Sequence, residues 1–151
     1  MPSQTDSHPA IPKAFHDLLS GDAVAVLATT RTDGTQHLTP VWIDVEEGLL
    51  LVNARQDRLK TAHMRARPQV SVCVVDPRNP YRYLSVTGVV ESFGEDGAMS
   101  QMDSLARRYL RVRRYPWARP GERRLLFRIR PTRVLADPGD ADVPEPELPE
   151  L

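Results

Sequence analysis

Short apolar runs that end at turn residues make up most of this chain, and their spacing limits what it can fold into. Six expected β-strands follow from these runs, at residues 23–30, 36–43, 49–54, 69–76, 81–93 and 124–136. Asp33-Gly34 joins the first two as a hairpin, because glycine tolerates the positive φ that such turns need. No regular strand–helix–strand alternation is present. The sequence therefore predicts a mainly β fold, a six-stranded antiparallel β-barrel with inserted helices.

Two segments between these strands change to helical spacing. Residues 56–67 carry apolar side chains at helical intervals, with Asp57 available as a cap and Pro68 as a stop. Residues 98–111 predict a second, amphipathic helix. Gly88 lies within the fifth expected strand, where a glycine indicates a bulge or a close approach of the backbone.

The length of 151 residues fits one domain whose two ends lie outside the core. Residues 1–10 are polar, and residues 137–151 carry six acids, four prolines and no base. Such segments bury too little apolar surface to offset the entropy of ordering them, so we expect both to be disordered. The folded body is then residues 11–136, which is small enough to gain stability from a partner subunit.

The charge of the chain is balanced overall but not along its length. The formal net charge is zero, which argues against a nucleic acid or an anionic membrane as a partner. Without the six acids of residues 137–151 the body is net basic by about six charges, which favours a small anionic ligand. A basic patch for nucleic acid is left as an alternative.

Motifs of several common enzyme classes are absent from the sequence. It has no P-loop, no GxGxxG after a strand, no HExxH and no GxSxG. The four histidines are scattered, and the single cysteine, Cys73, lies in an apolar run, so no metal site is expected. A Ser-His-Asp triad stays open, since only the fold brings its members together. Without a secretory signal or a membrane-length apolar run, the expected location is the cytoplasm.

The segment VNARQDRLKT, residues 52–61, places a cluster of polar side chains where a strand ends and a helix begins. Free N–H groups and the helix dipole favour an anion at such a point. Arg58, Lys60 and Thr61 would complete a phosphate site. In a regular helix Lys60 points roughly 200° away from Arg58, so convergence requires Arg58 to lie in the loop before the helix. The alternative is a solvated basic turn.

The segment LTPVWI, residues 38–43, is a second candidate for ligand contact. Pro40 lacks an N–H and belongs on an edge strand or at a bulge, where neighbouring backbone groups are open to a polar ring. Trp42 fits either the core or the wall of a site. Tyr81 and Tyr83 share one strand face and offer a stacking surface, although a barrel core explains them equally well.

Taken in order, these segments resemble the pyridoxamine 5′-phosphate oxidase-like split-barrel family. The resemblance rests on AVAVLATTRTDGTQHLTPVWI, LLLVNARQDRLKTAHMRARPQVSV and YLSVTGVVE, and it extends from Phe15 to Ala136. Its most specific part is RLKT followed by an arginine-rich turn and Pro68. The match is nearest to the branch that uses the deazaflavin coenzyme F420, while relatives that use FMN share the scaffold. The resemblance implies a split β-barrel of the FMN-binding type that forms a homodimer.

The resemblance also implies a cofactor site. It puts the cofactor phosphate on Arg58, Lys60 and Thr61. The ring would lie on two neighbouring strands, along Thr39, Pro40, Val41 and Trp42 and along Val52, Asn53 and Ala54. Tyr81 and Tyr83 would come from the other subunit and close over the ring. Many relatives have a polar residue at the position of Pro40, so this chain departs from the pattern there and lacks one N–H.

The activity that the resemblance implies is an F420-dependent oxidoreductase, which transfers hydride from the reduced cofactor to an electron-poor small organic substrate. The cofactor carries the hydride, and the protein positions it. No residue is identified as catalytic or as the proton donor, and the substrates of this branch are diverse, including tetrapyrroles and activated ring lactones. The alternatives are an FMN-dependent oxidase or reductase on the same fold, and a split-barrel protein that binds or stores its ligand without turnover.

Overall fold

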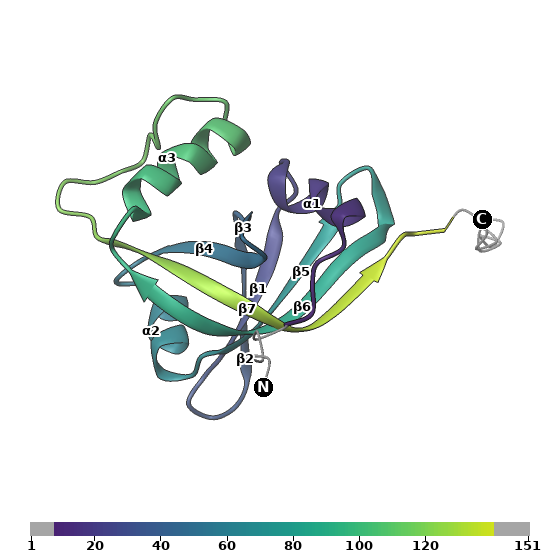
Figure 1. Cartoon of the computed structure of the whole chain (residues 1–151). Helices are drawn as coiled ribbons and strands as arrows, with labels where there is room; N and C mark the ends of the chain where they lie inside the picture. The colour runs from purple at the N-terminus through teal and green to yellow at the C-terminus, as the bar shows by residue number, and fades with distance from the viewer. Residues whose placement is uncertain (1–7, 141–151) are drawn as a thin grey trace, which may run out of the picture.

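The computed structural model describes residues 8–140, so the expectations for residues 1–7 and 141–151 lie outside the described residues. The chain forms seven strands and a few short helices (Figure 1). The elements are η1 (Lys13–Phe15), α1 (Asp17–Ser20), β1 (Ala25–Thr30), β2 (Gln36–Val41), β3 (Asp44–Glu46), β4 (Leu49–Arg55), α2 (Leu59–Ala66), β5 (Gln69–Asp76), β6 (Asn79–Gly94), α3 (Ala98–Tyr109) and β7 (Arg124–Asp137).

All seven strands belong to one antiparallel sheet in the order β2-β1-β5-β6-β7-β4-β3. This confirms the mainly β, antiparallel fold, but the expected number of six strands was wrong. The prediction ran the second strand to Ile43, whereas β2 ends at Val41 and the chain pairs again as β3 against β4. β3 has three residues, two of them acidic, which is too short for a visible alternation.

The main core lies on the inner face of the curved sheet. Phe127, Leu27 and Ile43 are among its fully buried side chains. The N-terminal helices add Leu18 and Leu19 to this core, and α2 adds another apolar side chain. Neither η1 nor α1 was predicted from the sequence. Each has only three or four residues, which is too few for a helical periodicity to be recognised.

α3 packs on the opposite face of the sheet from α2 (Figure 1). Side chains alternate along β4, so Leu50, Val52 and Ala54 enter the main core while Leu51 faces a second cluster with Ala98 and Leu126. The same alternation turns two polar residues of β4 toward the α3 side. The strand thus carries apolar side chains into the core and polar ones to the place where the cavity described below lies.

Gly88 is a point of close backbone approach, and the strand register shifts there, as the sequence suggested. A Cβ at this position would meet Ile129 Cγ2 at 2.6 Å and the carbonyl oxygen of Arg130 at 2.8 Å. These distances are shorter than real contacts, so only glycine fits between β6 and β7 here. The close approach of these two long strands therefore depends on glycine at position 88.

The start of α2 and the end of β7 differ from the predicted bounds by a few residues. α2 begins at Leu59, and its N-cap is Arg58 rather than Asp57, whose carboxylate pairs with Arg55 instead. β7 continues to Asp137, which pairs with Tyr83. β7 therefore ends one residue beyond the last expected strand, 124–136. Within residues 8–140, no helix has the length and apolar character needed to cross a bilayer.

Candidate functional site

A cavity of about 380 Å³ opens where β2, β4, α2, α3 and the loop before β7 meet. Cationic side chains form one end of its lining and aromatic ones the other, and the two groups meet where Arg124 lies over the ring of Tyr115. The lining residues are Val24, Pro40, Val41, Trp42, Asn53, Ala54, Arg55, Arg58, Lys60, Met102, Leu105, Tyr115, Trp117 and Arg124. The cavity therefore has the two-part character that suits a ligand with an anionic end and a flat ring.

The cationic end gathers Arg55, Arg58, Lys60 and Arg124 from three elements and one loop. Arg58 has the extended backbone of an N-cap, with φ −85° and ψ 151°, so it lies before the helix. This is the condition under which Arg58 and Lys60 can converge, and both line the cavity. Arg55 and Arg124 lie opposite each other on β4 and β7.

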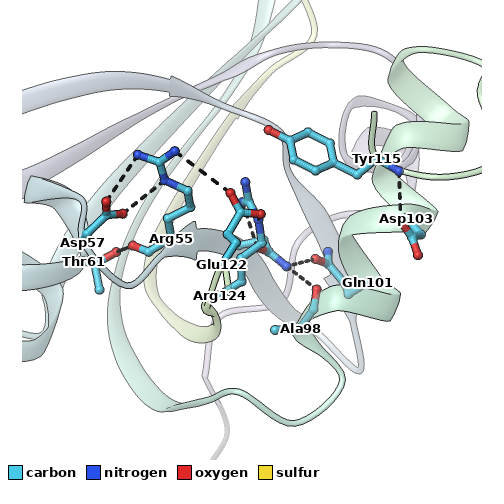
Figure 2. Close-up of polar contacts among 10 residues, drawn as sticks. Arg55, Asp57, Thr61, Ala98, Gln101, Asp103, Tyr115, Glu122 and Arg124 are labelled. Atoms are coloured by element: carbon cyan, nitrogen blue, oxygen red, sulfur yellow. Dashed lines mark hydrogen bonds and ion pairs between the residues drawn. The ribbon is translucent and has the colours of Figure 1, made fainter. Parts of the chain in front are cut away.

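Two carboxylates neutralise part of this charge. Arg55 lies between Asp57, at 3.1 Å, and Glu122, at 4.0 Å, and Arg124 pairs with Glu122 at 3.1 Å (Figure 2). In residues 8–140, Arg58 and Lys60 have no carboxylate at ion-pair distance. Four cations against two carboxylates leave this end of the cavity positive.

Lys60 is half-buried among these cations. Burial, followed by the charges of Arg58, Arg124 and Arg55, lowers the pKa of Lys60 below its ordinary value. Both effects have the same sign, because each one disfavours the ammonium form. An anion placed among these side chains would relieve the repulsion, so the site favours a negatively charged ligand.

Arg124 is held in one position by its neighbours. Its side chain is buried, donates to Asn53 Oδ1 at 3.3 Å, and lies over the ring of Tyr115 with Cζ 4.7 Å from the centroid. Asn53 in turn donates to the carbonyl of Ala98 at 2.7 Å and to Gln101 Oε1 at 2.8 Å. This network ties β4, β7 and α3 together around the cavity. The guanidinium is thus fixed before any ligand arrives.

The aromatic end is built around Trp42. Its ring stacks on Tyr109, with centroids 5.1 Å apart and planes 6° from parallel, and meets Tyr115 edge-on at 6.2 Å. Trp117 continues the wall and is 60% exposed, so it lies at the open edge. The sequence left Trp42 open between core and wall. Trp42 is partly exposed, belongs to neither apolar cluster, stacks on Tyr109 of α3 and lines the cavity.

Seven of the residues expected to bind the cofactor line the cavity: Pro40, Val41, Trp42, Asn53, Ala54, Arg58 and Lys60. Pro40 lies on β2, which is one of the two edge strands of the sheet, as predicted. Thr39, Val52, Thr61, Tyr81 and Tyr83 do not line it.

Three of these five are direct neighbours in sequence of lining residues. Val52 is in the main core, and Thr61 is buried and donates its hydroxyl to the carbonyl of Arg55 at 2.6 Å. Thr39 has a buried Oγ1 without a hydrogen-bond partner in the described chain. Tyr81 is 65% exposed, and Tyr83 lies opposite Val75 on β5.

Seven lining residues were not predicted from the sequence. Met102 and Leu105 carried a helical signal that was read as core packing. Tyr115, Trp117 and Arg124 had only one signal, the alternation of arginines and aromatics in residues 113–124, whereas Arg55 lies within the polar segment 52–61. Val24 was read as part of a buried strand. In the range 8–140, no group of three or more His, Cys, Asp or Glu side chains could hold a metal ion.

Comparison with known proteins gives one family and many structural neighbours. Residues 11–136 match the family model described as pyridoxamine 5′-phosphate oxidase. A structure named F420 reductase is 32% identical, with a TM-score of 0.73 over 83% of this chain and 98% of its own. No match was found among curated proteins.

Two further neighbours are more distant and show the fold alone. A conserved hypothetical protein from Mycobacterium tuberculosis is 23% identical, with a TM-score of 0.67 over 88% of this chain and 90% of its own. A putative pyridoxamine 5′-phosphate oxidase from Listeria innocua is 20% identical, with a TM-score of 0.59 over 82% of this chain and 94% of its own.

Proposed function

This chain belongs to the pyridoxamine 5′-phosphate oxidase family, and from that premise we propose that it is an oxidoreductase that uses the deazaflavin coenzyme F420. In this proposal the reduced cofactor gives hydride to an electron-poor small organic substrate. The neighbour named F420 reductase, at 32% identity over nearly its whole length, supports this choice of cofactor.

The observation that carries the proposal is the division of the cavity into a positive end and an aromatic end. A cofactor with a phosphate and a flat conjugated ring needs both, and a volume of about 380 Å³ lies within the range of cofactor sites.

The protein's own contribution is binding, orientation and exclusion of water. Arg58 and Lys60 would hold the phosphate, with Arg55 and Arg124 adding fixed positive charge behind them. The ring would lie along Pro40–Trp42 and Asn53–Ala54. Thr39, Val52 and Thr61 support these segments from behind, and the Thr61 hydroxyl holds the end of β4 against α2. Trp42 and Tyr115 would keep water from one side of the ring.

A second copy of the chain would complete the site. The sheet face opposite the main core carries Pro40, Val26, Cys73, Ser85 and Leu135 in one row across five strands, because directly paired residues share a face. Several apolar side chains on this face are exposed in the single chain. An uncovered apolar face of this kind favours association. We propose a homodimer in which Tyr81 and Tyr83 of one chain close over the ring held by the other.

An FMN-dependent oxidase or reductase is the second candidate, since the positive end and the flat apolar walls suit FMN as well. The deciding experiment measures dissociation constants for F420 and FMN on one apo preparation. The proposal expects tighter binding of F420, followed by hydride transfer to an activated acceptor. Tighter binding of FMN would favour the second candidate. Binding of F420 with no transfer to any acceptor would favour a protein that stores or senses the cofactor.

A further inference from the structure

Lys60 is the one lysine among the residues that line the cavity, and like Arg58 it has no side-chain partner within residues 8–140. It lies in the first turn of α2, lines the cavity and is half-buried. Within the described part of the chain, its ammonium makes no side-chain hydrogen bond and no ion pair. A lysine in a cavity without a carboxylate is free to react, because no fixed contact holds its nitrogen.

Every charged group that faces Lys60 from the surrounding elements is a cation or is already paired. Arg58 precedes α2, Arg55 comes from β4 and Arg124 from β7. The carboxylates that accompany these arginines, Asp57 and Glu122, are held by Arg55 and Arg124. Burial and then these three guanidiniums lower the pKa of Lys60, which enlarges the fraction of neutral amine near neutral pH. Desolvation and a neighbouring cation are the two conditions that activate a lysine as a nucleophile.

The arginines around Lys60 remain charged at every pH at which the protein is folded, because a guanidinium does not lose its proton in proteins. They therefore continue to attract an anion when Lys60 itself is neutral. A nucleophilic amine beside fixed anion-binding groups suits a molecule that carries both a carbonyl and a negative charge. The aromatic wall of Trp42, Tyr115 and Trp117 further favours a planar ligand.

We propose that Lys60 forms a reversible imine with small anionic aldehydes that enter this cavity. The neutral amine attacks the carbonyl carbon, a C–N bond forms, and the carbonyl oxygen leaves as water with the two hydrogens of the amine. Starting from the ammonium, one further proton passes to solvent. No electrons are exchanged. The reverse reaction needs only water, so the adduct comes and goes with the aldehyde.

This inference goes beyond the proposed cofactor chemistry, although it rests on the same positive cavity. An aldehyde bound at Lys60 would occupy the phosphate position and exclude the cofactor. The amine of Lys60 can act as a nucleophile when neutral, whereas the guanidinium of an arginine stays charged and does not. Lys60→Arg keeps the positive charge for a phosphate but removes the nucleophile, so the two functions can be separated in one variant.

The chain makes the test simple, because Lys13 and Lys60 are its only lysines. The full-length protein is incubated with pyridoxal 5′-phosphate, reduced with borohydride to trap the imine, and mapped by peptide mass spectrometry. We expect one adduct, at Lys60. Lys60→Arg should carry none there, while Lys13→Arg, a matched change of the exposed lysine, should be labelled as the wild type is. Pyridoxal, which lacks the phosphate, should need about 10-fold or more higher concentration for equal labelling.

Labelling of Lys13 or the N-terminal amine as strongly as Lys60 in the wild-type protein would overturn the proposal, and so would equal labelling by pyridoxal. Both results come from the wild-type chain and do not depend on whether a variant folds. The outcome is independent of the cofactor proposal. If neither F420 nor FMN binds while Lys60 is labelled selectively, only the cofactor proposal fails. If a cofactor binds while Lys60 is not labelled selectively, only this one fails.

Discussion

At the scale of single residues, Arg58 and Lys60 are the cations with which a ligand phosphate can pair, because neither has a carboxylate partner among residues 8–140. A charge-assisted hydrogen bond contributes about 1.5–3 kcal/mol. Lys60→Ala or Arg58→Ala should therefore weaken binding of F420 by about 10- to 150-fold, measured by fluorescence titration. The unfolding free energy should change by less than about 0.5 kcal/mol, since neither side chain makes a contact that the fold needs.

The control for this prediction is a cofactor analogue without its phosphate, with Lys13→Ala and Arg78→Ala as matched changes of exposed cations elsewhere. The penalty should vanish with the phosphate, and the control variants should bind as the wild type does. Equal losses with and without the phosphate would mean that these side chains act on another part of the ligand.

His63 is a second residue whose charge state has a measurable effect. Its Nδ1 lies 2.9 Å from Thr29 Oγ1, and burial, with His37, Arg67 and Arg31 nearby, lowers the pKa of His63. The unfolded chain then takes up the proton more readily. The stability contributed by neutral His63 is full above an unfolded pKa of about 6.5 and is lost as the pH falls toward the folded pKa.

Thermal unfolding between about pH 7 and pH 5 isolates this effect, because the carboxylates with lowered pKa values, Asp17, Asp33 and Asp76, titrate below their ordinary value of 3.8. We expect the melting temperature of the wild type to fall more steeply over this range than that of His63→Gln. Parallel curves for the two proteins would show that His63 does not couple to folding.

At the scale of elements, the phenol of Tyr109 is one of the side chains that attach α3 to the sheet. Tyr109 stacks on Trp42, donates its hydroxyl proton to the carbonyl of Ala23 at 2.7 Å and accepts from the N–H of Ile43 at 3.2 Å. Tyr109→Phe keeps the stacking but leaves two backbone groups without their partner. We expect a loss of about 1–3 kcal/mol in urea unfolding, because unpaired polar groups in partly buried sites are costly.

Tyr81→Phe is the matched control for this loss, because Tyr81 is 65% exposed and its change should leave the unfolding free energy of the single chain nearly unaltered. If Tyr109→Phe also unfolds as the wild type does, then α3 is held by other contacts. Arg108 is the first to examine, since it pairs with Asp44 at 3.1 Å and donates to the carbonyls of Gly21 and Ile43.

The elements that could be predicted from the sequence are those with enough residues to show a period. The long apolar strands and both major helices were placed to within a few residues. β3 and the N-terminal helices could not be predicted in this way. They are too short to show a period, and their contacts with other segments of the chain stabilise them. The site divides in the same way. Arg58 and Lys60 share one local motif, whereas Arg124 and Tyr115 reach the cavity only because β7 pairs with β4.

At the scale of the whole molecule, the uncovered sheet face predicts association. Leu38 is 63% exposed, Leu135 55% and Val26 40%. Light scattering at micromolar concentration should give about twice the chain mass of 17.0 kDa. Leu38→Asp should shift the protein toward monomers, because a carboxylate on this face would lose its water on association. Val112→Asp, an equally apolar change in the loop after α3, should leave the mass unchanged.

A monomer that still binds the cofactor with full affinity would contradict the shared site. In that case Tyr81 and Tyr83 would have no part in binding, and the apolar face would need another explanation. A dimer that persists in Leu38→Asp would instead place the interface elsewhere on the molecule.

The cavity is lined from five stretches of chain that lie far apart in sequence: Val24, residues 40–42, 53–60 and 102–105, and a last stretch at 115–124. None of these stretches can bind the ligand alone, so the affinity belongs to the native state and is absent from the unfolded chain. Folding and binding are then thermodynamically linked. A ligand at 100 times its Kd raises the unfolding free energy by about 2.7 kcal/mol. The melting temperature thus reports occupancy, and a library of candidate molecules can be screened by heat before any reaction is known.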